Sequence, residues 1–236
     1  MIKEVLSIIK LTLLRFIRRN RLIALFFLIL YGILLYQLIF LKEFESSKKI
    51  ITLIVSYIGV LLTGGLLKDE INQGYIDILF TGIKRSRIIL GKFFGISLIV
   101  ITYYFLCLFA ISIFAFCYKE SFYKFIDFDG FIVIIYMISI GLFLSLYLRG
   151  NLNFVLIFLL EFLFIFYFDY IGLIDLLEKN SYISNRFLKI FFISPIFPHI
   201  VYIDSSNVAL LSLSLFTLIF LVLNILIFKG MDFLKE

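Results

Sequence analysis

A single carboxylate, Glu161, lies in the middle of the apolar run 152–168, LNFVLIFLLEFLFIFYF. A charged side chain at the centre of a bilayer costs ~2.5–3.5 kcal/mol on insertion scales, so such a group is protonated, paired with another helix or exposed to an aqueous cavity. No basic residue lies within one helical turn of Glu161. We therefore expect Glu161 either to line an aqueous pathway or to form a structural hydrogen bond as a neutral acid.

The only histidine of the chain, His199, stands next to the second of its two prolines, Pro195 and Pro198. One histidine cannot form a multi-histidine zinc site, and no cluster of carboxylates and cysteines near it completes one, so we expect no metal site. We expect His199 at the membrane interface. Hydrolysis inside a membrane needs a paired Ser-His, Asp-Asp or multi-His site, and we expect no acidic or histidine partner at the depth of Glu161. The sequence therefore predicts no catalytic residues.

A polar stretch, KDEINQGYIDILFTGIKRSRIILGKFFG, extends from Lys68 to Gly95. Its apolar residues recur at helical spacing, at Ile71, Tyr75, Ile78 and Leu79. Asp69, Gln73 and Asp77 repeat on the opposite face, and basic residues follow the segment, each sign where a helix dipole favours it. This pattern predicts a short amphipathic helix over residues 69–81. The alternative is an ordinary loop whose basic residues only set the topology.

Most of the remaining chain is apolar enough to be membrane. Of 236 residues, 63% are hydrophobic and 16% charged, and the mean hydropathy is +1.14, far from the composition of a soluble domain. Long uncharged runs of the length that crosses a bilayer occur at residues 22–41, 50–67, 93–117, 131–148, 152–168 and 208–228. Lipid offers no partner to backbone N–H and C=O groups, so these runs must be helical. We expect an all-α polytopic membrane protein with six transmembrane helices.

Residues 1–19 form an amphipathic pattern before the first span. Apolar residues make one stripe at helical spacing, and most of the charged residues lie opposite it. This predicts a helix in the inner interface of the membrane. Its function is either to anchor and orient the first span or, in addition, to contact a cytoplasmic partner.

Lysine and arginine are divided unequally between the two sides that six spans define. Fourteen lie at the termini, in the 68–95 stretch and after the fourth span, and eight lie on the other side. The positive-inside rule therefore places both termini in the cytoplasm. The formal charge of +6 reflects this topology and attraction to anionic lipid headgroups, so we expect no nucleic-acid partner.

The outer segment before the last span alternates apolar clusters with polar breaks. Its apolar pieces are about ten residues long, too short to cross a bilayer, and Pro195 and Pro198 stop a continuous helix. We predict outer re-entrant or interfacial helices in this segment.

The 68–95 stretch resembles the membrane subunits of ABC-2 type transporters. The resemblance rests on an acidic residue and glycine followed by an apolar and acidic turn, small residues, a basic group and a Gly-Lys pair, in the order Glu70, Gly74, Tyr75–Leu79, Thr81–Gly82, Lys84–Arg87 and Gly91–Lys92. The layout of spans is similar over nearly the whole chain. Departures are Ile83, where many relatives have proline, and the lack of a large outer domain.

The resemblance implies that residues 69–81 are a coupling helix that docks into a separate nucleotide-binding ATPase subunit. The residues it assigns to this contact are Asp69, Glu70, Gln73, Gly74, Asp77, Arg85 and Arg87. It also implies an outer gate at residues 175–203, with Pro195 and Pro198, in the cytoplasmic membrane of a bacterium. The chain has no G-x-x-x-x-G-K-[ST] phosphate loop, so the partner would bind ATP and magnesium and this chain would hold no cofactor.

Six helices enclose a pathway poorly, so a second permease subunit, identical or similar, is expected. The small-residue pattern Gly91-x-x-x-Gly95 favours close helix packing, either within one subunit or between two. Glu161 is the candidate for contact with a transported substrate. Alternative functions are an ion-gradient-driven transporter or channel that uses Glu161, and a bacteriocin-immunity type subunit. The sequence does not identify the substrate.

Overall fold

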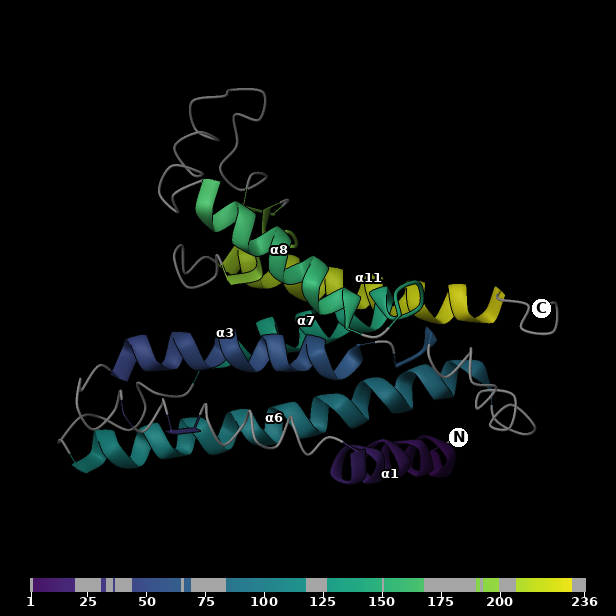
Figure 1. The fold of residues 1–236 in the computed structure, drawn as a ribbon, viewed down its shortest axis with the longest axis horizontal. Coiled ribbons are helices and arrows are strands. Elements are labelled where there is room, and N and C mark those ends of the chain that lie inside the picture. The colour runs from purple at the N-terminus through teal and green to yellow at the C-terminus, as the bar shows by residue number, and fades with distance from the viewer. Residues whose placement is uncertain are drawn as a thin grey trace.

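The part of the chain that the structure describes is helical and contains no strand. The computed structural model describes residues 2–19, 31–32, 36, 44–64, 66–68, 84–117, 127–149, 151–167, 190–191, 193–199 and 207–230 (Figure 1). The helices in these ranges are α1 (Ile2–Arg19), α3 (Phe44–Thr63), α6 (Arg85–Cys117), α7 (Phe128–Leu144), α8 (Leu152–Tyr167) and α11 (Asn207–Gly230). The expected all-α class is confirmed for this part. Most of the predicted first span, 22–41, and all of the predicted coupling helix, 69–81, lie outside it.

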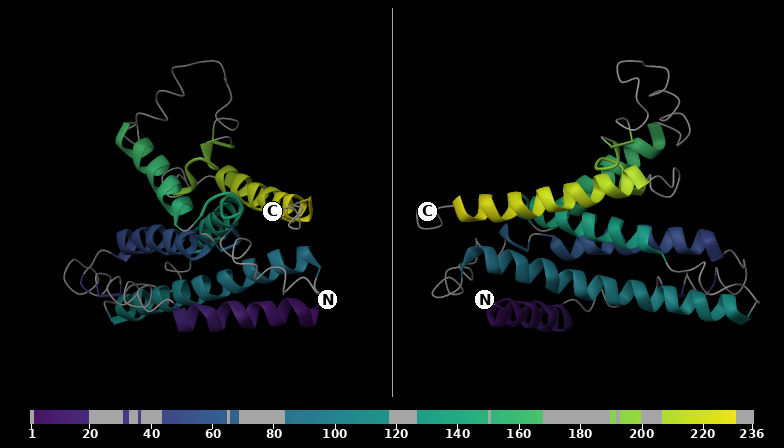
Figure 2. Two further views of the ribbon diagram at one scale, coloured as in Figure 1. Left: turned by 45° about the vertical axis from the view of Figure 1, so that its right-hand side comes forward. Right: turned by 180° about the vertical axis from the view of Figure 1, so that it is seen from behind.

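The helices stack in layers. Contacts between residues near the ends of neighbouring helices show in which direction each helix runs. Figures 1 and 2 show α1 beside α6, α6 beside α3 and α7, and α8 and α11 on the far side of α3 and α7. Thr52 of α3 lies 3.1 Å from the hydroxyl of Tyr104 of α6, near the start of the first helix and past the middle of the second. The amide of Lys68, just after α3, donates to the carbonyl of Ser145, just after α7, over 2.9 Å. Hence α3 runs antiparallel to α6 and parallel to α7.

Two of the described helices are long and apolar enough to cross a bilayer. These are α6, with 33 residues, and α11, with 24. Shorter apolar helices lie at Phe128–Leu144 and Leu152–Glu161. The bounds of α8 and α11 lie within two residues of the predicted runs 152–168 and 208–228, whereas α6 begins at Arg85 and α3 at Phe44, upstream of the runs 93–117 and 50–67.

Helix α7 packs against α3, α6, α8 and α11 and contributes to both clusters of buried apolar side chains. It approaches α3 closely where Gly141 faces Val60 and Thr63. A Cβ at Gly141 would clash with the hydroxyl of Thr63 and lie 3.3 Å from the Cα of Val60. Glycine is therefore the residue that lets these two parallel helices meet at this point.

Helix α1 lies along the first half of α6 and runs in the same direction. Glu4 pairs with Arg87, Ile8 lies over Gly91, and Thr12 lies over Gly95, each one helical turn further along both helices. A Cβ at Gly91 would be 2.6 Å from the Cβ of Ile8, which is buried. The Gly91-x-x-x-Gly95 pattern thus packs within the chain, against the predicted N-terminal helix.

Candidate functional site

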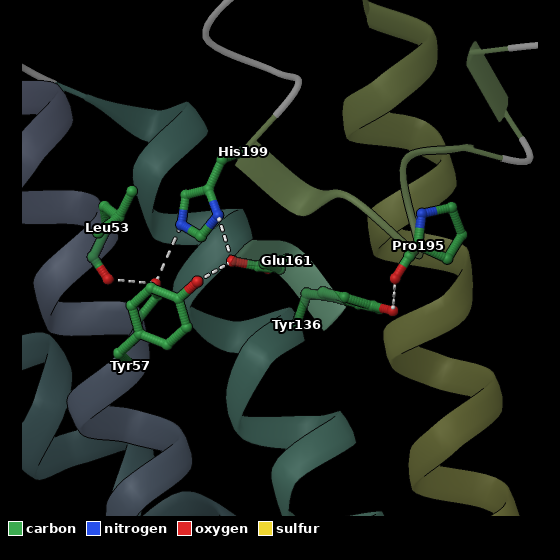
Figure 3. A network of polar contacts seen from close by, with 7 residues as sticks. Leu53, Tyr57, Tyr136, Glu161, Pro195 and His199 are labelled. Carbon is green, nitrogen blue, oxygen red and sulfur yellow. Dashed lines mark hydrogen bonds and ion pairs between the residues drawn. The ribbon is translucent and has the colours of Figure 1, made fainter. Parts of the chain in front are cut away.

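Glu161 lies in a buried polar cluster that joins three parts of the fold. The residue is 2% exposed, and its Oε2 accepts a hydrogen bond from the hydroxyl of Tyr57 on α3. The same oxygen lies 3.4 Å from Nδ1 of His199, which is 4% exposed (Figure 3). We call Ser56, Tyr57, Glu161 and His199 the polar cluster. It links α3 and α8 to residues 193–199, which we call the proline segment.

The second nitrogen of His199 extends the cluster to α3. Its Nε2 lies 3.1 Å from the hydroxyl oxygen of Ser56, and that hydroxyl donates to the carbonyl of Leu53 over 2.7 Å. Both ring nitrogens of this buried histidine therefore have polar neighbours. Burial without such neighbours would cost the desolvation of each group, so the geometry holds the ring in one orientation.

Aromatic rings cover the cluster on the side of α8. The ring of Tyr57 lies 5.7 Å from that of Phe158 and 6.1 Å from that of Phe154, in edge-to-face contacts, and 6.0 Å from the ring of His199. Against this apolar cover, Oε1 of Glu161 has no hydrogen-bond partner among the residues that the structure describes. The carboxyl group is thus held through one oxygen only.

The proline segment is attached to the other helices as well. The hydroxyl of Tyr136 on α7 donates to the carbonyl of Pro195 over 2.6 Å, as Figure 3 shows beside Glu161. Immediately upstream, the carbonyl of Phe191 accepts from Ser212 of α11 over 2.6 Å. Pro198 and His199 lie in a short 3₁₀ turn, and both are buried. Within the predicted gate 175–203, only residues 190–191 and 193–199 are described, and these contact α3, α7, α8 and α11.

One expectation about Glu161 is wrong: it was expected to have no histidine partner, and His199 lies beside it. His199 is buried among the helices, and its expected place at the membrane interface stays a prediction. The partner was missed because it belongs to a different segment, where no periodicity relates it to α8. The available signal was that the only histidine directly follows the second of two prolines that interrupt an apolar stretch.

Three polar contacts lie just downstream of the predicted coupling helix, 69–81. Arg85 donates to the carbonyls of Phe228 and Lys229, at 3.5 and 3.0 Å, and so caps the C-terminal end of α11. Arg87 forms an ion pair with Glu4 of α1. Asp69, Glu70, Gln73, Gly74 and Asp77 lie outside the described residues. The two arginines assigned to a partner thus make contacts within the chain, and a docking role for them stays a prediction.

Further buried polar residues, which the sequence did not single out, join the helices. Asn153 of α8 donates through Nδ2 to the carbonyls of Val60 and Gly141 and to the hydroxyl of Thr63, at 3.2–3.3 Å. Asp127 caps the start of α7 by accepting from the amide of Gly130 at 3.1 Å. In the described ranges no three His, Cys, Asp or Glu side chains come together as a metal site would require.

The arrangement holds helices together through polar contacts and brings one carboxyl and one imidazole to within 3.4 Å of each other. No model of a known protein family matches this chain, and no curated protein matches it either.

Proposed function

We propose that this chain is the membrane-spanning subunit of an ABC-2 type exporter, which moves a substrate outward while a separate nucleotide-binding ATPase hydrolyses ATP. The proposal includes six spans, both termini in the cytoplasm of a bacterium, and a second permease subunit beside this one. ATP and magnesium would be bound by the ATPase. The sequence of residues 69–81 and the spacing of the apolar runs supply the resemblance on which the proposal rests.

The observation that carries the proposal is the anchoring of both flanks of residues 69–81. Upstream, Lys68 is bound to Ser145 at the end of α7. Downstream, Arg85 caps α11 and Arg87 pairs with α1. A force applied to residues 69–81 would therefore reach α1, α7 and α11 directly, as a coupling element requires.

The directions of the helices are compatible with this layout. Helices α3 and α7 run parallel, α6 runs against α3, and the start of α6 lies at the end of α11. These are the relative directions that spans two, three, four and six of the proposed topology would have. The start of α1 lies at the same end, beside Arg87.

The test is purification of the chain from its native membrane, followed by measurement of bound ATPase activity. We expect an ATPase to copurify, and we expect Glu70→Arg together with Asp77→Arg to remove it, because both substitutions reverse charge on the proposed docking helix. Lys49→Glu, at the other end of α3, is the matched charge reversal and should leave the complex intact. Retention of the ATPase and of its activity in the double variant would refute the coupling assignment.

A second candidate is transport driven by an ion gradient, which the contact between Glu161 and His199 favours. A buried carboxyl and imidazole are typical of proton pathways in membrane proteins. The two functions differ in their energy source. Transport by the purified chain in vesicles that responds to a proton gradient, without ATP or an ATPase, would favour the second candidate over the first.

A further inference from the structure

The hydroxyl of Ser56 indicates which ring nitrogen of His199 carries a hydrogen when the imidazole is neutral. A serine hydroxyl has one hydrogen, and here it is donated to the carbonyl of Leu53 over 2.7 Å. The Ser56 oxygen is then an acceptor toward Nε2 of His199, 3.1 Å away, and Nε2 must carry a hydrogen. A neutral imidazole carries one hydrogen only, so its Nδ1 would be a bare acceptor.

That bare Nδ1 would face an oxygen that is itself an acceptor. Oε2 of Glu161 lies 3.4 Å from Nδ1 and already accepts from the hydroxyl of Tyr57. Two opposed lone pairs and an unpaired negative charge, in a site where both residues are at least 96% buried, would be strongly unfavourable. One proton between Nδ1 and Oε2 removes both penalties, whether it resides on the imidazole or on the carboxyl.

We propose that the Glu161–His199 contact is a proton-binding site, and that its proton holds the proline segment against α3 and α8. The site needs no cavity, because a proton occupies only the gap between the two heavy atoms. The other titratable side chains that face it from the described elements are Tyr57 of α3 and Tyr136 of α7. The first donates to Oε2, and the second is committed to Pro195.

Loss of the proton should release one end of the proline segment. His199 contributes the contacts of the segment with both α3 and α8, whereas Tyr136 holds Pro195 through an uncharged hydrogen bond. We call this role of the proton the latch: the proline segment stays bound to α3 and α8 while the proton is present and is released when the proton is lost. This inference holds for an ATP-driven or an ion-driven transporter, because it depends on the polar cluster alone.

The first test determines directly which ring nitrogens of His199 carry a hydrogen. His199 is the only histidine, so ¹⁵N-labelled histidine gives a single-site signal in the full chain, purified with a tag that contains no histidine. We expect Nε2 to carry a hydrogen at every pH and Nδ1 to lose, as the pH is raised, the proton that it holds or shares with Oε2 of Glu161. A neutral ring with the hydrogen on Nδ1 and a bare Nε2 would overturn the assignment.

The second test measures whether the proline segment opens when the proton is lost. Ser194 lies in the proline segment and is fully buried, so a Ser194→Cys reporter reacts with a water-soluble thiol reagent only when the segment opens. Cys117 is exposed and is replaced by serine in all variants. The same chain without Ser194→Cys retains only the buried Cys107 and measures the background reaction. The chain is held in lipid nanodiscs, which leave both faces accessible.

Glu161→Gln is the matched control, because its amide does not titrate: with its nitrogen in the place of Oε2, it would donate a hydrogen to Nδ1 at every pH. With Glu161 present, we expect the reporter to react faster at high pH than at low pH. The ratio of these two rates should be at least about tenfold larger than the same ratio in the Glu161→Gln chain. This factor corresponds to losing one charged hydrogen bond. Since the thiol is the same in both chains, its own titration cancels. Equal pH dependence in the two chains would overturn the latch, as would a slow, pH-independent reaction in a His199→Gln chain.

Discussion

Gly91 of α6 lies directly against Ile8 of α1, so that a Cβ at Gly91 would be only 2.6 Å from the Cβ of Ile8. Together with the Thr12–Gly95 and Glu4–Arg87 contacts, this position fixes the register of α1 along α6. The N-terminal helix is thereby part of the helical assembly.

Gly91→Ala should lower the free energy of unfolding by about 1–3 kcal/mol, since the added methyl overpacks the contact with Ile8. Thermal unfolding in detergent measures the effect. Gly230→Ala is the control, because nothing lies within 4 Å of a Cβ there. Addition of Ile8→Gly should make room for the methyl group, because it removes the Cβ and Cγ2 of Ile8 that the new Cβ would meet, so the double variant should lose less than the sum of the single losses. Strict additivity would contradict the contact.

Arg85→Met should loosen the last turn of α11, because it removes the donor to the carbonyls of Phe228 and Lys229. A cation at a helix C-terminus contributes about 0.3–1 kcal/mol, so hydrogen exchange of that turn should rise by about two- to fivefold. Lys84→Met removes an adjacent exposed charge and should leave the exchange unchanged. An equal rise in both variants would mean that net charge, and not the cap, matters.

Asn153→Leu should destabilise the contact between α3, α7 and α8. Its Nδ2 donates toward three oxygens on the other two helices, and hydrogen bonds between membrane helices average about 0.6 kcal/mol each, so we expect a loss of about 1–2 kcal/mol. Denaturant or thermal unfolding measures it. Ser214→Leu, at an exposed position of α11, should have no comparable effect.

The helices themselves were largely predictable. Apolar runs bounded by polar residues specify where a helix must be, and the bounds of α8 and α11 agree with the predicted runs to within two residues. Helix α6 was expected from Phe93 but begins at Arg85, because its polar first turns are held by Glu4 and by the end of α11. These contacts join segments that are far apart in the sequence, so the local pattern of apolar and polar residues could not predict them.

The polar cluster was predictable only in its centre. Glu161 was identified because a carboxyl in an apolar run must be compensated by something. Two residues compensate it. Tyr57 comes from the earlier helix α3, and His199 comes from the later proline segment. Tyrosines are frequent in this chain, so Tyr57 carried no signal of its own in the sequence.

The most direct measurement of the proposed function is site-specific crosslinking between residues 69–81 and the nucleotide-binding subunit. With Cys117→Ser as background, an Asp77→Cys chain should crosslink to the ATPase in native membranes. A Lys49→Cys chain, with its thiol at the opposite end of α3, should not. Formation of the first crosslink and absence of the second is the predicted result. Absence of any crosslink from Asp77→Cys to an ATPase, in membranes where the chain is intact, would contradict the account.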